Sequence, residues 1–368
     1  MTRLLRISYM PLTDAGLLFV ARAKSFDREE SLVFELRPEA SWANLRDKLA
    51  LGICDAAHML APAVVASALG LEGFPAPMIG AVALGLDGNA ISVSPALAKA
   101  LRGAMTGDSS DPQCTARALA EIIAERQVHG LPPLRFAHVF PFSTHHYQLR
   151  LWLAAGKIDP SAVRLMVTPP PLMEQSIVGD YIDGFCVGEP WNTLAQRAGA
   201  AEILHPCRAL VKNCPEKTLA FRADAARAEP EVARAAARAV RHAALWGERE
   251  ENRDEFCAII AENLDAGVTA DMVVSSLGWG GKTAPWLRLD SEATALSGDQ
   301  ALFVYMLMAA AGQTIASEDQ AALARQAFWP LDGAPPPPAI AAFRAPFDPA
   351  HWRESLAALT GKKGGVMK

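Results

Sequence analysis

The 368-residue sequence has no pair of cysteines spaced as C-x-x-C, although six cysteines are scattered along the chain. Because the cysteines are scattered and contain no such pair, neither a metal ribbon nor a disulfide framework is indicated. His138, His145 and Cys186 do not form a metal set either, because no short-range ligand pair frames them. We therefore expect no bound metal and no other cofactor.

Long apolar stretches are also missing from the sequence. No uninterrupted apolar run is long enough to span a membrane. The first residues pass directly into a strand pattern, without the apolar region or the small-residue cleavage site of a secretory signal peptide. We therefore expect a cytoplasmic protein that has no membrane partner.

The signatures of several enzyme classes are absent as well. The sequence contains no nucleophile elbow, P-loop, dinucleotide fingerprint or H-E-x-x-H zinc motif. The formal net charge of −5 argues against a nucleic-acid-binding surface over the whole chain. We expect a protein that is not an enzyme and that does not contact nucleic acid directly.

The sequence does contain an alternation of strand and helix patterns, in a chain too long for one simple core. Apolar runs at residues 4–10, 32–36 and 56–60 predict strands that are separated by helices. This order is typical of an α/β protein whose mostly parallel sheet is covered on both faces. A second α/β set follows the polar loop at residues 107–112, and long Ala- and Arg-rich helices follow within residues 231–264.

One stretch, DGFCVGEPWN at residues 183–192, has the pattern of an anion-binding corner. A short apolar run ends at Gly188, and Pro190 follows at a position typical of the first residue of a helix. A buried strand followed by glycine and a helix start presents free backbone N–H groups to an anion. The Glu189 carboxylate would repel an anion, so we expect it to cap the helix or to pair with a lysine or arginine.

Six stretches of the sequence resemble those of a known family and occur in the same order. They read MPLTDAG, ASWANLRDKLALG, DAAHMLAP, FPFSTHHYQLRLWLAAG, FCVGEPWN and PEKTLAFRAD. On these motifs the chain resembles the nitrate- and bicarbonate-binding proteins of cyanobacterial-type ABC importers. It also resembles their cytoplasmic relative, the nitrate/nitrite sensor that controls an antiterminator. The resemblance extends from residue 7 to about residue 260, and FCVGEPW is its most specific part.

The resemblance implies an α/β fold with two lobes, of the periplasmic-binding-protein-like type II, with discontinuous lobes and a ligand cleft between them. One lobe is expected to comprise residues 1–105 and 218–368, including a C-terminal helical extension. The other lobe is expected to comprise residues 106–217. An anion would lie in the cleft, where hinge closure would trap it.

The resemblance also implies five residues that bind nitrate or nitrite, namely Trp42, Asn89, His145, Gly188 and Lys217. The family usually has glutamine where this chain has Asn89, which is shorter by one methylene. A lysine charge, histidine and amide donors and a flat indole ring suit a planar monoanion. Relatives that hold bicarbonate with a metal replace the lysine by an acid, so Lys217 favours nitrate or nitrite without metal. Taken alone, Asn89 would be a turn residue and Lys217 a solvated lysine.

The function implied first is that of a cytoplasmic nitrate/nitrite sensor. In the anion-free state it would sequester an RNA-binding antiterminator of the ANTAR class, and anion binding would close the lobes and release this partner. The alternative is the substrate-binding component of a nitrate/nitrite ABC importer. A second alternative is an enzyme on the same fold, with a site that carries no recognisable motif.

Overall fold

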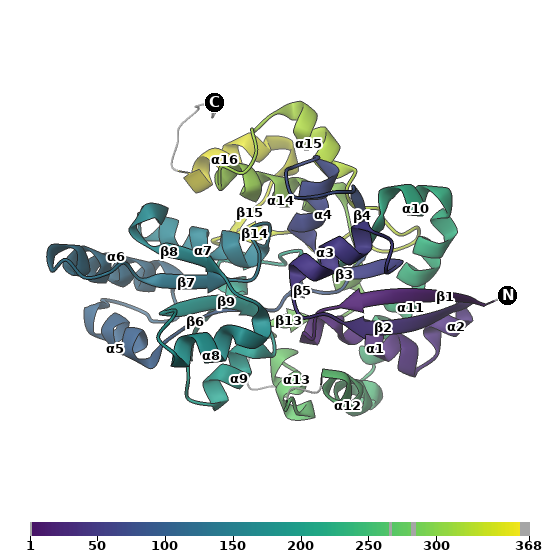
Figure 1. Cartoon of the computed structure of the whole chain (residues 1–368), viewed down its shortest axis with the longest axis horizontal. Coiled ribbons are helices and arrows are strands. Elements are labelled where there is room, and N and C mark those ends of the chain that lie inside the picture. Colours follow the sequence, from purple (N-terminus) through teal and green to yellow (C-terminus); the bar gives the residue numbers. More distant parts are fainter. Residues whose placement is uncertain (1, 265–266, 281–284, 361–368) are drawn as a thin grey trace.

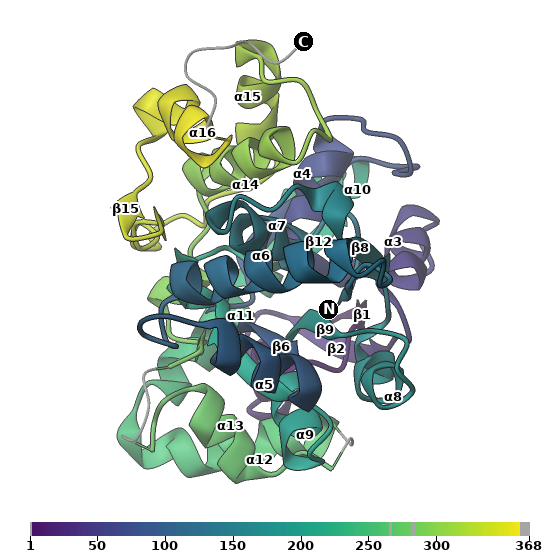
Figure 2. The same ribbon diagram turned by 90° about the vertical axis from the view of Figure 1, so that its left-hand side faces the viewer.

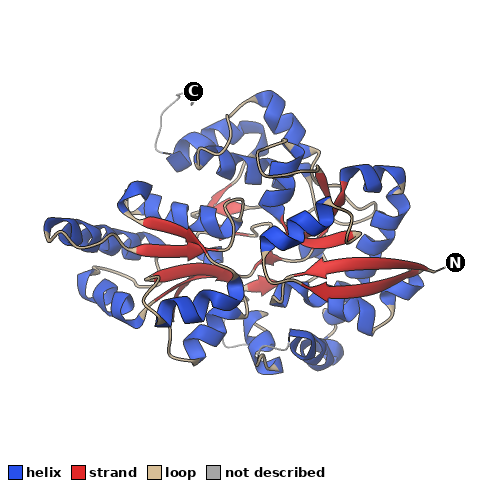
Figure 3. Cartoon of the chain, viewed as in Figure 1, coloured by secondary structure: helices blue, strands red, loops and turns tan. Residues whose placement is uncertain are grey.

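The structure is a computed structural model that describes residues 2–264, 267–280 and 285–360. Figure 1 shows two α/β halves side by side, each built around its own sheet. In Figure 3 the strands lie inside each half and the helices cover them. The chain therefore has the layered arrangement that its alternating strand and helix patterns predict.

The first sheet has five strands in the order β2-β1-β3-β12-β4. Its strands are β1 (Arg3–Tyr9), β2 (Leu32–Pro38), β3 (Ala56–Leu60), β4 (Met78–Ala83) and β12 (Lys217–Arg222). Strand β1 pairs in parallel with β2 and β3, whereas β12 runs antiparallel between β3 and β4. Lys217 at the start of β12 therefore lies opposite Leu60, at the carboxyl end of β3. Ligands of α/β proteins usually bind at this edge of a sheet.

Helices cover both faces of the first sheet. They are α1 (Gly16–Ala23), α2 (Phe26–Glu29), α3 (Trp42–Ala50), α4 (Ala61–Ala68), α10 (Ala223–Ala228) and α11 (Pro230–Gly247). Helices α1 and α11 contribute to one hydrophobic core, and α3 and α4 contribute to another. The hydroxyl of Ser41 accepts a hydrogen bond from the Asn44 N–H at 3.2 Å, which starts α3 by satisfying one free donor of its first turn.

The second sheet also has five strands, in the order β10-β6-β9-β7-β8. Its strands are β6 (Asn89–Val93), β7 (Arg135–His138), β8 (Arg164–Val167), β9 (Gly184–Gly188) and β10 (Glu202–Pro206). The helices of this half are α5 (Pro95–Ala104), α6 (Pro112–Val128), α7 (Thr144–Ala155), α8 (Met173–Val178) and α9 (Trp191–Arg197). Strands β7, β8 and β9 are parallel, and β6 runs antiparallel to both β9 and β10.

Strand β6 and helix α5 belong to the second half, whereas the predicted first lobe extends to residue 105. Strand β6 pairs with β9, with Asn89 opposite Gly188. The predicted boundary lies at the polar loop that follows α5, because the composition of a sequence shows where loops lie. Composition does not show which sheet a strand joins. The change of sheet comes earlier, before β6.

Two segments connect the halves and run beside each other. They contain two short strands, β5 (Leu86–Asp87) and β11 (Val211–Lys212). The Leu84 N–H donates to the Lys217 carbonyl at 2.9 Å, and the Asp87 N–H donates to the Cys214 carbonyl at 3.0 Å. The two crossings are therefore hydrogen-bonded to each other, close to the start of β12.

The C-terminal part adds helices at two ends of the molecule (Figure 2). Its elements are α12 (Arg253–Leu264), α13 (Ala270–Ser276), α14 (Gly298–Ala310), α15 (Glu318–Arg325), α16 (Trp352–Thr360), β13 (Leu287–Arg288), β14 (Ala341–Ala342) and β15 (Ala345–Pro346). Helix α14 packs against α4, α15 and α16 and also contacts α7 of the second half, so it is buried nearly all round. Within the described ranges, no helix is both long and apolar enough to cross a lipid bilayer.

Candidate anion-binding site

The five residues predicted to bind the anion come from five separate elements, and each lies at the end of its element. Trp42 begins α3, Asn89 begins β6, His145 lies in the first turn of α7, Gly188 ends β9 and Lys217 begins β12. All five are buried, and the side chains of His145 and Lys217 are at most 1% exposed. Elements from both halves therefore bring these residues to the boundary between the two sheets.

Lys217 provides the positive charge of the site, and Asp14 holds it there. The Lys217 Nζ lies 2.9 Å from the Asp14 Oδ2, and neither side chain is more than 4% exposed. Burial works to lower the pKa of Lys217, but the carboxylates of Asp14 and Glu216 outweigh it and raise this pKa. Burial likewise works to raise the pKa of Asp14, but Lys217 and His58 hold it well below its usual range. The lysine therefore keeps its charge without contact with water.

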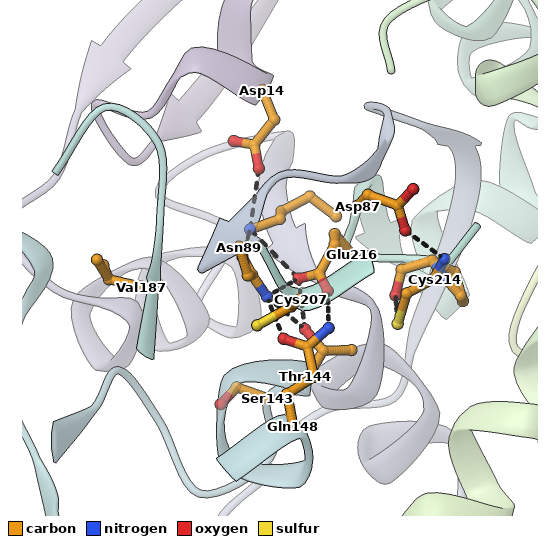
Figure 4. Close-up of polar contacts among 12 residues, drawn as sticks. Asp14, Asp87, Asn89, Ser143, Thr144, Gln148, Val187, Cys207, Cys214 and Glu216 are labelled. Atoms are coloured by element: carbon orange, nitrogen blue, oxygen red, sulfur yellow. Dashed lines mark hydrogen bonds and ion pairs between the residues drawn. The ribbon is translucent and has the colours of Figure 1, made fainter. Parts of the chain in front are cut away.

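Asn89 joins Lys217 to a network of polar side chains, several of which are labelled in Figure 4. Its Oδ1 accepts a hydrogen bond from the Lys217 Nζ at 3.3 Å. Its Nδ2 donates to the Glu216 Oε2 at 2.7 Å and to the Gln148 Oε1 at 2.9 Å. The Thr144 hydroxyl donates to the same Glu216 oxygen, and the Gln148 Nε2 donates to the Glu216 Oε1 at 3.2 Å. The Asn89 amide is thus directed at partners within the protein.

Several buried side chains in or around this network have polar atoms without a hydrogen-bond partner among the residues that the structure describes. Those able to donate include the indole nitrogen of Trp42, the ring nitrogens of His58 and His145 and the hydroxyls of Thr13 and Thr218, and the acceptor oxygens are the Asp14 Oδ1 and the Glu189 Oε1. Burial, followed by the charge of Lys217, lowers the pKa of His145 well below its ordinary value, so its neutral ring offers one N–H donor. Buried polar groups without partners are rare, so this group of donors is suited to a bound acceptor.

Trp42 is linked to the charged pair through His58. The two rings lie edge to face with their centroids 5.6 Å apart. The His58 Nε2 lies 3.0 Å from the Asp14 Oδ1 on its other side. The indole therefore lies one side chain away from the carboxylate that pairs with Lys217.

Gly188 allows strand β9 to approach the lysine closely. A Cβ added to Gly188 would lie 3.3 Å from the Lys217 Nζ, 3.4 Å from the Leu12 Cδ2 and 3.5 Å from the Asn89 Oδ1. The first of these distances is shorter than most real Cβ contacts. Glycine therefore leaves space beside the ammonium group that a larger residue would fill.

Loops from the two halves are hydrogen-bonded to each other at this boundary. The Thr13 N–H donates to the Glu189 carbonyl at 2.8 Å, and the Trp191 Nε1 donates to the Pro11 carbonyl at 3.2 Å. The Glu189 carboxyl accepts from the Thr193 hydroxyl at 2.6 Å, in the first turn of α9, and burial raises its pKa to about 7. The bond comes from a side-chain hydroxyl rather than from a backbone N–H of the helix, so it is neither the helix cap nor the pairing with lysine or arginine expected for Glu189. Because the site is buried, we expect an anion to enter only when the halves separate.

Asp14, Thr144, Gln148 and Glu216 belong to the network, although the sequence motifs do not identify them as site residues. All four lie inside the resembling stretches, and Thr144, Gln148 and Glu216 lie next to or within one helical turn of predicted residues. Two signals could have found them. A buried lysine needs carboxylates close by, and residues 144 and 148 share one face of a helix that also carries a predicted ligand residue.

The chain is similar in sequence to a known family and to several curated proteins. A model of the NMT1-like family matches residues 2–261. The nitrate/nitrite binding protein NrtA of Nostoc sp. is 30% identical over 277 residues, which make up 73% of this chain and 59% of that protein. The nitrate import ATP-binding protein NrtC of Synechocystis sp. is 31% identical over 272 residues, or 73% of this chain and 38% of that protein. The chain thus spans less than two thirds of the length of these curated relatives.

The fold has a close counterpart among solved structures. The periplasmic nitrate-binding protein NrtA from Synechocystis PCC 6803 superposes with a TM-score of 0.82 at 24% sequence identity. The superposition covers 97% of this chain and 98% of that chain. The predicted two-lobe, periplasmic-binding-protein-like α/β fold is therefore confirmed.

Proposed function

The chain belongs to the NMT1-like family, and from this premise we propose that its buried site binds nitrate or nitrite. The observation that carries the proposal is the buried Lys217 ammonium, close to the donors of Trp42, His145 and Thr13 that lack partners in the described part of the chain. The names of the relatives described above, which refer to nitrate or nitrite binding and nitrate import, support this choice of anion.

The chemistry of the site suits a small, flat, singly charged anion. Nitrate is weakly hydrated and accepts hydrogen bonds in its own plane, so removing it from water costs less than for a strongly hydrated ion. An indole ring can serve both as a donor and as a flat wall. Each charge-assisted hydrogen bond contributes about 1.5–3 kcal/mol net. A few such bonds, less the cost of closing the halves, allow a dissociation constant in the micromolar range, about −8 kcal/mol.

The role we propose is that of the substrate-binding component of a nitrate/nitrite importer. The relatives described above are named as binding and import proteins, which favours this role over the sensor that the sequence analysis puts first. The cytoplasmic location and the ANTAR-class partner stay predictions, for which these relatives offer no support. They give no support to an enzymatic role either.

Isothermal titration calorimetry with nitrate, nitrite and bicarbonate tests the choice of anion. We expect micromolar binding of nitrate or nitrite, unchanged by a metal chelator, because Lys217 supplies the positive charge. We expect no binding of bicarbonate at the same concentrations. In the described ranges, no three His, Cys, Asp or Glu side chains are arranged to hold a metal ion. Absence of binding for both nitrate and nitrite at millimolar concentration would contradict the proposed function.

The substitution Lys217→Ala tests the proposed position of the site. We expect nitrate affinity to fall at least about tenfold, because one charge-assisted contact contributes about 1.5–3 kcal/mol. Since Asp14 would be left as a buried charge without a partner, Asp14→Asn is combined with it to preserve folding. Lys99→Ala, at an exposed position of α5, is the matched control and should bind as the unaltered chain does. An unchanged affinity in the folded double variant would show that the anion binds elsewhere.

A further inference from the structure

The site contains more negative than positive charge. Lys217, Asp14 and Glu216 are each at most 3% exposed. The Lys217 Nζ lies 2.9 Å from the Asp14 Oδ2 and 3.4 Å from the Glu216 Oε2, so one ammonium group faces two carboxyl groups. If both carboxyl groups are ionised, the three side chains together carry a net charge of −1 before any anion binds. A second unbalanced negative charge in a buried site is strongly unfavourable.

The hydrogen-bonding capacity of Lys217 is also fully used. An ammonium group has three N–H donors. Three acceptors surround the Lys217 Nζ, namely Asp14 at 2.9 Å, Asn89 at 3.3 Å and Glu216 at 3.4 Å. A bound anion can receive a hydrogen bond from this lysine only if one of the three acceptors is released. Glu216 is the most distant of them.

We propose that the site binds its anion together with one proton, which Glu216 takes up, and that this makes Glu216 a determinant of specificity for singly charged anions. This inference rests on the proposed function. Protonation of Glu216 removes one negative charge as the anion adds one. It also frees one N–H of Lys217 to point at the anion. The proton comes from the solvent, and no covalent bond other than the carboxyl O–H is formed.

The surroundings of Glu216 can hold the neutral carboxyl group without rearrangement. The Thr144 hydroxyl already contacts the Glu216 Oε2, and a hydroxyl accepts a hydrogen bond as readily as it donates one. Thr144 can therefore rotate its hydrogen away and accept the new carboxyl hydrogen. Burial raises the pKa of Glu216 above its ordinary value, although Lys217, Thr144 and Asn89 work against this rise.

The other titratable groups that face Glu216 are less suited to take the proton. Lys217 and the Asp14 carboxylate stabilise each other's charged forms, and burial keeps the His145 ring neutral. His58 lies beside Asp14 at 3.0 Å rather than beside Glu216. Asp87 and two buried thiols, Cys207 and Cys214, also face Glu216, and burial raises the pKa of each of them.

The inference predicts how affinity depends on pH. Nitrate does not titrate in the working range, so any pH dependence belongs to the protein. Affinity should be constant below the anion-free pKa of Glu216, which lies above the ordinary value for glutamate. Above it, the dissociation constant should rise about tenfold per pH unit until the pKa of the anion-bound state is reached. A doubly charged oxyanion such as sulfate would require two protons and should not bind.

Calorimetric titration of the full chain with nitrate, in buffers that differ in ionisation enthalpy at one pH, measures the protons taken up. We expect close to one proton in the pH range where affinity declines. In Glu216→Gln the number should fall to near zero, and the dissociation constant should become independent of pH. Glu189→Gln is the matched control, because Glu189 is a second buried carboxyl group next to Gly188 whose pKa burial raises to about 7. This control should take up as many protons as the unaltered chain.

The possible results separate this inference from the function on which it rests. Nitrate binding with no proton uptake by the unaltered chain would overturn the inference and leave the function intact. Uptake that persists in Glu216→Gln, or that disappears in Glu189→Gln instead, would also overturn it. Failure of both nitrate and nitrite to bind would overturn the proposed function, and the inference with it. If Glu216→Gln does not fold, the buffer series on the unaltered chain still decides whether a proton is taken up.

Discussion

Asp87, in the first connection between the halves, combines an unusual backbone geometry with a buried carboxyl group. Asp87 has a positive φ of 64°, in the left-handed region that Asn and Asp tolerate better than most residues. Its Oδ1 accepts a hydrogen bond from the Cys214 N–H at 2.9 Å, which ties the first crossing to the second. Burial raises the pKa of Asp87 to about 7, so near neutral pH this contact is made by a carboxyl group that resists ionisation.

Asp87→Asn is expected to stabilise the protein at pH 8. Asparagine accepts the same hydrogen bond and tolerates the same backbone geometry, but it does not have to be ionised in a buried place. The folded-state pKa of about 7 exceeds the unfolded value, so the unaltered chain loses stability as pH rises from about 4 to 7. The variant should therefore gain on the order of 1–4 kcal/mol in free energy of unfolding across that window.

Thermal unfolding of the two proteins at a series of pH values measures this gain. The difference in melting temperature should grow between pH 4 and 7 and then level off. Asp332→Asn, at an exposed turn position, is the control and should show no such trend. A difference that is the same at pH 5 and pH 8 would contradict the prediction.

At the scale of elements, the local sequence predicts where strands and helices form. It does not predict which other elements they pair with or pack against. The apolar run predicted at residues 56–60 is β3 (Ala56–Leu60), and the run at 32–36 lies within β2. The place of β6 in the second sheet depends on its pairing with β9, almost a hundred residues away in the sequence. Local periodicity reports which face of a strand is buried and carries no information about its partner.

The site shows the same contrast between residues that local motifs identify and contacts that join distant parts of the chain. Lys217, His145 and Trp42 are named from the motifs that contain them. The hydrogen bond from Asn89 to Glu216 joins residues far apart in the sequence, so it could not be derived from local patterns. For the same reason, the sequence motif predicts that Asn89 donates to the anion, whereas in the structure the Asn89 amide donates to Glu216 and Gln148.

Helix α7 positions Thr144, His145 and Gln148, and Ser143 fixes its start. The Ser143 hydroxyl accepts from the His146 N–H at 3.2 Å and donates to the Phe140 carbonyl at 2.6 Å. Ser143→Ala is expected to lower the free energy of unfolding by about 1–2 kcal/mol and also to weaken nitrate binding, because the first turn carries site residues. Chemical denaturation and calorimetry measure the two effects.

Ser317→Ala is the matched control for this prediction. Ser317 caps α15 by accepting from the Gln320 N–H at 3.2 Å, in a helix that contributes no residue to the site. A similar loss of stability with unchanged nitrate affinity is expected. Equal losses of affinity in both variants would mean that α7 has no special role in positioning the site.

At the scale of the whole molecule, the two halves contact each other directly beside the site. The Trp191 indole of the second half donates to the Pro11 carbonyl of the first. Trp191→Phe keeps an aromatic ring but removes this donor. We expect nitrate affinity to fall about two- to tenfold, since a neutral hydrogen bond contributes about 0.5–1.5 kcal/mol. The loss should appear mainly as faster dissociation, because the contact joins the halves over the bound anion.

Rapid-mixing measurements of nitrate dissociation test this expectation. Trp246→Phe is the control, because Trp246 is a half-buried indole in α11 that takes no part in the contacts between the halves described above. Its dissociation rate should match that of the unaltered chain. A slower association with an unchanged dissociation rate in Trp191→Phe would contradict the proposed role of the contact.

The two crossings that connect the halves also deliver site residues: Asn89 follows the first crossing directly, and Lys217 follows the second. An anion bound as we propose would lie beside the crossings that join the two halves rather than between their outer rims. Nitrate has only four atoms and could not bridge a wide opening, but beside the crossings that join the halves it does not have to. If the halves rotate about these crossings, we expect a small displacement beside Lys217 to correspond to a much larger one at the rim, because the rim lies farther from the crossings. The small size of the anion would then not prevent it from controlling such a movement.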